Sequence, residues 1–162
     1  MNKVAFLDRD GIINKKAPEH QYITRPEDFI FLDNVPRAIK LLNDNGYLVI
    51  IITNQRGIAR GLMTMDDLTA VHHSMCERLK KSGAHIDNIY VCPHNNGECN
   101  CRKPDIGLFL KAESDYTIDK SQSFMIGDSE SDIVAGQRYG IRSILTTDLY
   151  STVLSLLDKS NR

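Results

Sequence analysis

Asp8 and Asp10 are two carboxylates placed two residues apart directly after the short apolar run at residues 4–7, and Gly11 follows them. A short apolar run is typical of a buried strand. We therefore expect both carboxylates at the carboxyl end of that strand, where open α/β sheets bind ligands. Gly11 would let the backbone turn away without a Cβ clash. Taken alone, the stretch fits an acidic turn equally well, since Asp and Gly are common turn residues.

Two later apolar runs, at residues 47–52 and 124–126, also end in polar side chains. The polar residues at the three predicted strand ends are Asp8 and Asp10, Thr53 and Asn54, and Asp128 followed one turn later by Asp132. Carboxylates gathered at one edge would repel one another, and a divalent cation with oxygen ligands, such as Mg²⁺, relieves that repulsion and is readily shared with a phosphate. The residues predict phosphoryl transfer, with the Asp8 carboxylate attacking phosphorus to form an aspartyl-phosphate.

Four residues with zinc-ligand chemistry fall within ten positions: Cys92, His94, Cys99 and Cys101. Three thiolates and one imidazole complete the tetrahedral shell of a structural zinc site and leave no position for water. The metal is therefore predicted to order the loop at residues 92–103 and to take no part in chemistry. The competing interpretation is a disulfide between two of these cysteines, which a reducing compartment disfavours.

Apolar runs alternate with helical patterns along the chain. Strands are predicted at residues 4–7, 47–52, 86–91, 124–126 and 141–145, and helices between Asn34 as cap and Gly46, from a Thr64 cap through Leu79, and at residues 108–114, 133–139 and 151–157. This alternation predicts an α/β fold, a Rossmann-like, doubly wound parallel sheet covered by helices on both faces. The long connection at residues 12–31 has no sustained period and is expected to flank the site as a flap. His72, His73 and Cys76 are interpreted as packing or surface residues.

The composition sets limits on partners and location. A chain of 162 residues with 41% hydrophobic residues fits one domain, residues 1–162. A formal net charge of −1 does not suggest a surface that binds nucleic acid. No run approaches the length of a membrane span, so no membrane partner is expected. We expect a cytoplasmic monomer.

Four sequence motifs resemble those of the haloacid dehalogenase (HAD) superfamily of phosphatases. They are DRDG at residues 8–11, TNQ at 53–55, RKP at 102–104 and GDSESD at 127–132, in that order. Within the superfamily, TNQRGIARG and CPH…CNCRKP resemble the branch that holds D-glycero-D-manno-heptose 1,7-bisphosphate phosphatases and histidinol-phosphate phosphatase domains. The resemblance covers about residues 4–145. It implies a HAD fold without a large cap domain and a Mg²⁺-dependent phosphatase activity.

The resemblance also implies a role for each motif residue. Asp8 is the nucleophile and a Mg²⁺ ligand, and Asp10 protonates the leaving oxygen, then deprotonates water, and binds Mg²⁺ through its backbone carbonyl. Thr53 hydrogen-bonds the transferring phosphoryl group and Lys103 balances its charge. Asp128 completes the Mg²⁺ site, and Asp132 orients it from behind. Asn54, Gln55, Arg56 and Arg102 are implied to face the substrate, a small phosphorylated sugar.

Four features of the sequence bear on the substrate, two against a heptose substrate and two in favour of it. The spacer between His94 and Cys99 is short, which resembles the histidinol-phosphate type. Ser129 departs from the heptose enzymes, which often have a substrate-contacting lysine at its position. The GIARG run at residues 57–61 and the stretch at 22–31 resemble the heptose enzymes instead. A heptose bisphosphate is therefore the predicted substrate and histidinol phosphate the alternative. Two other classes stay open: a non-catalytic, zinc-ordered binding module and a nucleic-acid 3′-phosphatase.

Overall fold

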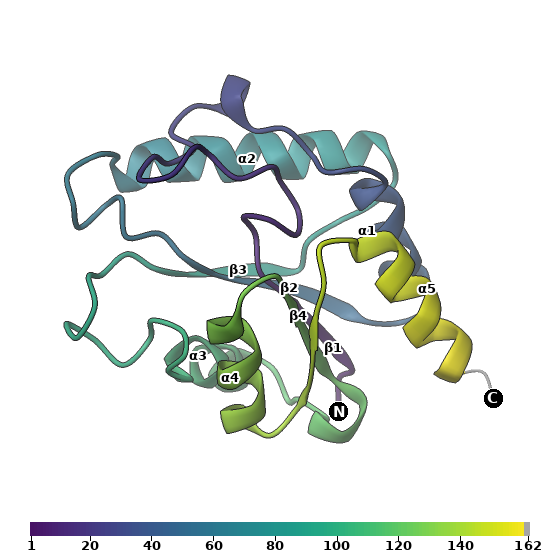
Figure 1. Ribbon diagram of the computed structural model, residues 1–162. Coiled ribbons are helices and arrows are strands. Elements are labelled where there is room, and N and C mark those ends of the chain that lie inside the picture. The colour runs from purple at the N-terminus through teal and green to yellow at the C-terminus, as the bar shows by residue number, and fades with distance from the viewer. Residues whose placement is uncertain (161–162) are drawn as a thin grey trace.

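A parallel sheet of five strands forms the centre of the computed structural model, which describes residues 1–160 (Figure 1). The strands are β1 (Val4–Leu7), β2 (Leu48–Asn54), β3 (Asn88–Cys92), β4 (Phe124–Gly127) and β5 (Arg142–Leu145), in the order β3-β2-β1-β4-β5. β1 pairs with β2 on one side and β4 on the other, so the winding of the chain changes direction beside it. The carboxyl end of β1 therefore lies at the switch point where such sheets bind ligands. The predicted doubly wound sheet is confirmed.

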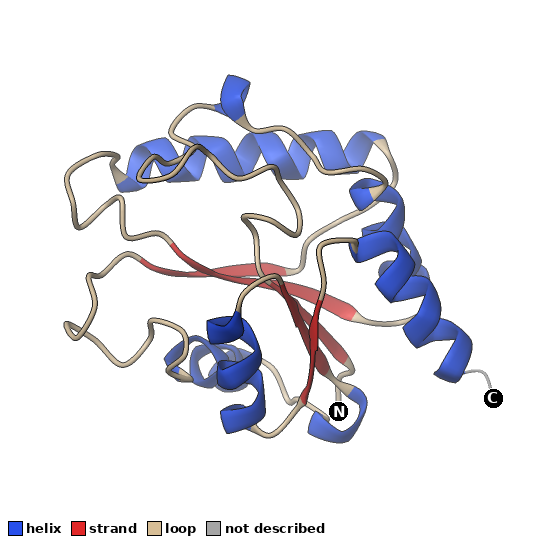
Figure 2. Cartoon of the chain, viewed as in Figure 1, coloured by secondary structure: helices blue, strands red, loops and turns tan. Residues whose placement is uncertain are grey.

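Helices cover both faces of the sheet (Figure 2). One face carries α1 (Val35–Asp44), α2 (Met65–Lys81) and α5 (Leu149–Ser160), and the other carries α3 (Gly107–Asp115) and α4 (Glu130–Tyr139). Successive residues of a strand point to opposite faces, so Ala5 and Leu7 pack in the first layer while Val4 and Phe6 pack in the second. This double burial explains why the strands appear in the sequence as uninterrupted apolar runs.

The ends of the helices agree with the sequence at two places and differ at a third. At α2, the Thr64 Oγ1 accepts from the Asp67 backbone N–H at 3.0 Å, and the Asp67 carboxylate accepts from the Thr64 N–H at 2.9 Å. Gly140 ends α4 with a φ of 95°. Asn34 precedes α1 but makes no side-chain capping bond. Asn34 thus occupies the predicted N-cap position without its side-chain bond, because its backbone is left-handed, with a φ of 61°, and not in the extended conformation that aims a capping side chain.

Element boundaries shift by a few residues where tertiary pairing decides them. β3 begins at Asn88, two residues after the predicted start, and continues to Cys92, which pairs with Asn54 of β2. Helix α4 begins at Glu130, and α5 extends from Leu149 to Ser160. No helix within residues 1–160 is long and apolar enough to cross a membrane.

The predicted flap is the segment between β1 and α1, and its only helical turn in the described chain is η1 (Pro26–Asp28). Figure 1 shows it passing alongside α2. Arg78 of α2 donates from Nη1 to the Phe29 carbonyl and from Nη2 to the Pro26 carbonyl, both at 2.7 Å. The C-terminal part of the flap is therefore anchored to α2. A second helical turn, η2 (Lys120–Gln122), precedes β4.

Candidate active site

Asp8 lies at the carboxyl end of β1 and is paired with a buried lysine. The Lys103 ammonium donates to Asp8 Oδ1 at 2.9 Å, to Asp132 Oδ1 at 2.6 Å and to the Ile52 carbonyl at 2.9 Å. Lys103 itself is 3% exposed. Burial raises the pKa of Asp8 to about 7 and the Asp132 charge adds to that rise, although Lys103 opposes it. One cation therefore compensates these carboxylates incompletely.

A third carboxylate completes an acidic cluster. Oxygens of Asp8, Asp128 and Asp132 lie within 4.8 Å of one another. Glycines admit this approach, because a Cβ at Gly11 would collide with the Asp128 carboxylate and one at Gly127 with the Asp132 side chain. Carboxylate oxygens at this spacing suit a hard divalent cation such as Mg²⁺.

A lysine from the flap reaches the same cluster. The Lys16 ammonium lies 2.7 Å from Asp128 Oδ2, while its side chain remains 58% exposed. The attraction between them raises the pKa of Lys16, so it is a cation at neutral pH. The flap thus brings a partly exposed positive charge to the edge of the acidic cluster.

Asp10 is held by donors on both carboxylate oxygens. Oδ1 accepts from Arg9 Nη2 at 2.7 Å and from Asn14 Nδ2 at 2.9 Å, and Oδ2 accepts from Gln55 Nε2 at 2.8 Å. Burial alone would raise the pKa of Asp10, but the Arg9 charge and these hydrogen bonds hold it below its usual value. The Asp10 side chain remains 30% exposed. It is therefore a fixed carboxylate with access to the cleft.

The TNQ residues are hydrogen-bonded within the site. Gln55 is 1% exposed, and its Nε2 donates to Thr53 Oγ1 at 2.9 Å as well as to Asp10. Asn54 donates to the Lys103 carbonyl at 3.2 Å and accepts from the Lys103 N–H at 3.1 Å. The Gln55 amide therefore holds Asp10 and the Asn54 amide holds the Lys103 backbone. Both residues also line the cleft beside Asp10, and their contact with substrate stays a prediction.

Arg56 and Arg102 differ from these two residues, since each has a buried nitrogen without a hydrogen-bond partner, Nε in Arg56 and Nη1 in Arg102. Burial alone would raise the pKa of Tyr22, but hydrogen bonds from Arg60 and Arg56 lower it. Tyr22 is on the flap, and it borders a cleft of about 230 Å³ lined by Asp10, Asn54, Gln55 and residues 16–23. The cleft therefore runs from the Asp10 carboxylate to the flap.

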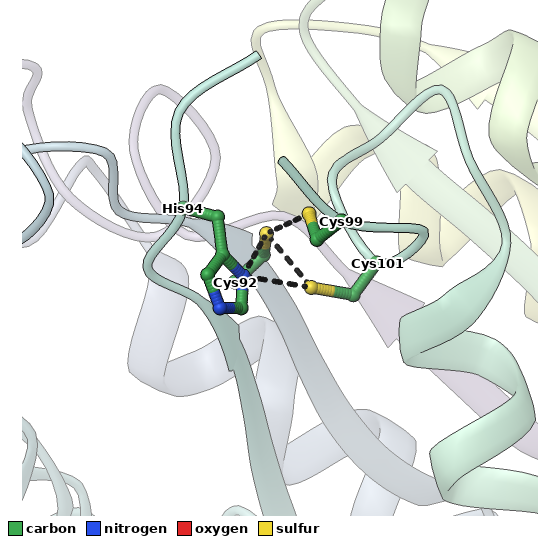
Figure 3. A group of neighbouring side chains, drawn as sticks. All are labelled: Cys92, His94, Cys99 and Cys101. Atoms are coloured by element: carbon green, nitrogen blue, oxygen red, sulfur yellow. Dashed lines mark hydrogen bonds between the residues drawn. The ribbon is translucent and has the colours of Figure 1, made fainter. Parts of the chain in front are cut away.

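The four predicted zinc ligands converge on one centre (Figure 3). The Cys92 sulfur lies 2.9 Å from the Cys101 sulfur and 3.4 Å from the Cys99 sulfur, and His94 Nδ1 lies 3.4 Å from the Cys101 sulfur. A disulfide bond is about 2.05 Å long, so the three cysteines of the cluster are not joined by disulfides. Cys76, which lies outside the cluster, is also a free thiol. The cluster has the donor set of a structural zinc site.

Backbone contacts tie this cluster to the loop after β2. The Gln55 N–H donates to the Cys92 carbonyl at 2.8 Å, and the Ala59 N–H donates to the Pro93 carbonyl at 3.2 Å. Lys103 follows Cys101 by two residues and is held by Asn54. The cysteine and histidine cluster is therefore connected to the residues that present Lys103.

Comparisons with known proteins agree with this geometry. The family model for polynucleotide kinase 3 phosphatase matches residues 3–149. A D-glycero-beta-D-manno-heptose-1,7-bisphosphate 7-phosphatase of Haemophilus ducreyi is 40% identical over 149 residues, covering 87% of this chain and 80% of the relative. One of Helicobacter pylori is 42% identical over 146 residues, covering 89% and 83%. The chain belongs to the HAD superfamily of phosphatases.

This HAD phosphatase also resembles solved structures of the superfamily, including a heptose bisphosphate phosphatase. A D,D-heptose 1,7-bisphosphate phosphatase from B. bronchiseptica, complexed with magnesium and phosphate, superposes with a TM-score of 0.84 at 29% identity, covering 97% of this chain and 99% of that one. A putative HAD-like phosphatase from Mesorhizobium loti gives a TM-score of 0.83 at 26% identity, with 98% and 87% covered. The predicted family is confirmed, and the chain is a phosphomonoester hydrolase.

The prediction from sequence did not include three residues that shape the HAD site: Arg9, Lys16 and His72. Arg9 is fully buried, pairs with Asp10 and lies 3.1 Å, at Nη1, from His72 Nε2. His72 is 9% exposed. One signal was present, because His72 is four residues after Leu68 and three before Met75, on the apolar stripe of α2. That spacing predicts burial but does not identify the partner.

Proposed function

We propose that this phosphatase removes the C7 phosphate of a D-glycero-D-manno-heptose 1,7-bisphosphate, with Mg²⁺ and through a phosphorylated Asp8. One observation carries the chemistry: Asp8 is at the switch point of the sheet, bonded to Lys103 and within reach of Asp128. The substrate is supported by relatives about 40% identical that bear this activity in their names.

The donor set fits the metal. Asp8, the Asp10 backbone carbonyl and Asp128 would hold Mg²⁺, which offsets the charge of the phosphoryl oxygens and of the attacking carboxylate. An Asp8 oxygen attacks phosphorus and the bond to the sugar oxygen breaks. Because the pKa of Asp10 lies below its usual value, Asp10 must first take up a proton, which it then gives to the leaving sugar oxygen. Water then attacks the same phosphorus while Asp10 takes its proton, and Asp8 is released. Lys103 and the Thr53 hydroxyl stabilise the charge that develops on the phosphoryl oxygens.

Three arginines have a buried nitrogen without a partner, Arg9, Arg56 and Arg102. We assign Arg56 and Arg102 to the rest of the substrate, because both Arg9 terminal nitrogens are already engaged by Asp10 and His72. Arg56 and Arg102 present planar guanidinium groups that donate two bonds at once to a phosphate or to sugar hydroxyls. Unsatisfied buried donors are costly, which supports a ligand oxygen as their partner in the working enzyme. We assign the phosphate at C1, or the neighbouring hydroxyls, to these side chains.

We assign Zn²⁺ to Cys92, His94, Cys99 and Cys101 as a structural ion that orders residues 92–103. In this proposal residues 1–162 act as one domain, as a monomer, on a small phosphorylated sugar and without nucleic-acid or membrane partners. A cytoplasmic location is supported by the four cysteines, none of which forms a disulfide in the described chain, as suits a reducing compartment. The net charge of −1 supports the exclusion of nucleic acid.

A substrate panel tests the proposal. Phosphate release is measured with Mg²⁺ for the alpha and beta anomers of the heptose bisphosphate, since relatives are named for both, for histidinol phosphate and for a 3′-phosphorylated oligonucleotide. The highest kcat/KM is expected for a heptose bisphosphate. A higher value for histidinol phosphate or for the oligonucleotide would overturn the substrate assignment. Asp8→Asn is the control, because a binding module would be unaffected by it.

A further inference from the structure

Arg9 is a fully buried cation in the middle of the DRDG motif, between two residues assigned to catalysis. It donates from Nη2 to Asp10 Oδ1 at 2.7 Å, and its Nη1 lies 3.1 Å from His72 Nε2. Its Cζ also lies 5.8 Å from the centre of the Phe29 ring. Burial of an unpaired guanidinium is costly. Here the two terminal nitrogens contact groups from two different parts of the fold, while Nε is buried without a partner.

His72 is suited to accept a hydrogen bond from Arg9. Arginine has donors only, so the 3.1 Å contact requires a lone pair on His72 Nε2 and places the proton of the neutral ring on Nδ1. Burial, together with the adjacent Arg9 charge, lowers the pKa of His72 to about 3, which agrees with a neutral ring. The next residue, His73, is exposed, so the chain offers a neighbouring histidine without this contact.

The contact of Arg9 with His72 affects the orientation of the Asp10 carboxylate. Asp10 Oδ2 is fixed by Gln55, and Oδ1 by Arg9 and Asn14. A guanidinium held at one terminal nitrogen can still swing about its side-chain torsions. A bond at the other terminal nitrogen removes that freedom, and with it one source of variation in the Asp10 carboxylate plane. The α2 helix thereby contributes to the site although none of its residues borders the cleft at Asp10.

We propose that His72 is a positioning residue: it fixes Arg9, and Arg9 fixes the carboxylate of Asp10 for its two proton transfers. The proposal rests on the function assigned to Asp10 above. Proton transfer depends steeply on geometry, and a misplacement of about 1 Å costs on the order of 100-fold in rate. Loss of the His72 contact should therefore lower kcat and leave KM nearly unchanged, because neither His72 nor Arg9 is placed against the substrate.

Three variants separate this role from simple packing. His72→Leu removes the acceptor and is expected to lower kcat by about 10- to 100-fold, with KM within about twofold. His72→Gln places an amide oxygen near the Nε2 position and should restore kcat to within about threefold of wild type. His73→Leu is the matched control and should behave as wild type. Full kcat in a folded His72→Leu protein, a parallel rise in KM, or no rescue by His72→Gln would overturn the proposal.

Thermal unfolding of each variant shows whether the protein is folded under assay conditions. If His72→Leu does not fold, His72→Asn replaces it, since its shorter amide cannot reach Arg9. It should then have a lower kcat than His72→Gln, and equal kcat values would overturn the proposal. Nitrogen NMR shifts of the His72 ring give a readout that does not depend on activity: a protonated Nε2 at neutral pH would refute the contact. Absence of hydrolysis of every phosphomonoester by wild type would instead refute the proposed function.

Discussion

Replacing Lys103 with methionine removes the one ammonium that bonds both Asp8 and Asp132. The substitution keeps a side chain of similar length in a position that is 3% exposed, so lost packing is a minor effect. It leaves two buried carboxylates without the 2.9 and 2.6 Å bonds they have in the wild type. Removing one partner of a buried ion pair costs about 3 to 5 kcal/mol, and Lys103→Met is expected to lower the free energy of unfolding by that amount.

The measurement is denaturant unfolding at pH 7.5 without added Mg²⁺, which would otherwise offset the carboxylate charges. Zn²⁺ is kept in the buffer so that the loop at residues 92–103 is unchanged. In a chain of this size 1 kcal/mol corresponds to about 2 to 4 °C, so the melting temperature should fall by roughly 6 to 20 °C.

A second substitution tests whether charge is the cause. Lys103→Met with Asp132→Asn removes one negative charge, while the Asn oxygen can still accept from Ser129 as Asp132 does. The double variant should recover about half or more of the lost stability, because the residues are in direct contact and their effects do not add. A Lys103→Met protein within about 1 kcal/mol of wild type, or a double variant no more stable than the single one, would refute this reasoning.

Three other predictions concern single residues. Asp10→Asn should keep the fold, as judged by circular dichroism, and lose phosphate release by about 10²- to 10⁴-fold, the usual contribution of a general acid and base; near-normal turnover would contradict its assigned role. Cys99→Ser should lower the melting temperature more than it changes the Mg²⁺ dependence of turnover, and a normal zinc content in that protein would contradict the ligand assignment. The pKa of His72 is depressed in the folded state to about 3, so the unfolded chain takes up the proton first and stability is lost as pH falls below about 6.5. Between pH 7.5 and 5, denaturant unfolding of wild type should show a loss about 2 kcal/mol greater than that of His72→Gln; equal losses would show that His72 is not held neutral.

The parts of the fold that follow from local rules were predictable. β1 was predicted with the bounds found, Val4–Leu7, because a strand buried on both faces leaves a continuous apolar run. The meeting of Asp8 with Asp128 followed from the rule that parallel strands end at one edge. The zinc-type cluster followed from ligand types within ten residues, which the chain can bring together without help from the rest of the fold.

The contacts that a sequence does not encode locally were missed. The bonds of Asn54 to Lys103 join residues 49 positions apart, and the contact of Arg9 with His72 spans 63 positions. No spacing rule relates such pairs, so the bonding partners of Asn54 and His72 could not be predicted. Gln55 shows the same effect, since its type suited a ligand contact and only the fold aims its amide at Asp10.

The Asn54 contact also limits how far the zinc-type cluster can affect the chemistry. Lys103 is held at two places: its backbone N–H and carbonyl by the Asn54 amide, and its ammonium by Asp8, Asp132 and the Ile52 carbonyl. None of these bonds involves a cysteine or His94. If the loop became less ordered at Cys99, the hydrogen bonds from Asn54 would still hold the Lys103 backbone, and with it the position of the ammonium. The cluster thus stabilises the loop more than it positions the catalytic lysine. Its loss should therefore lower the melting temperature more than it changes the Mg²⁺ dependence of turnover.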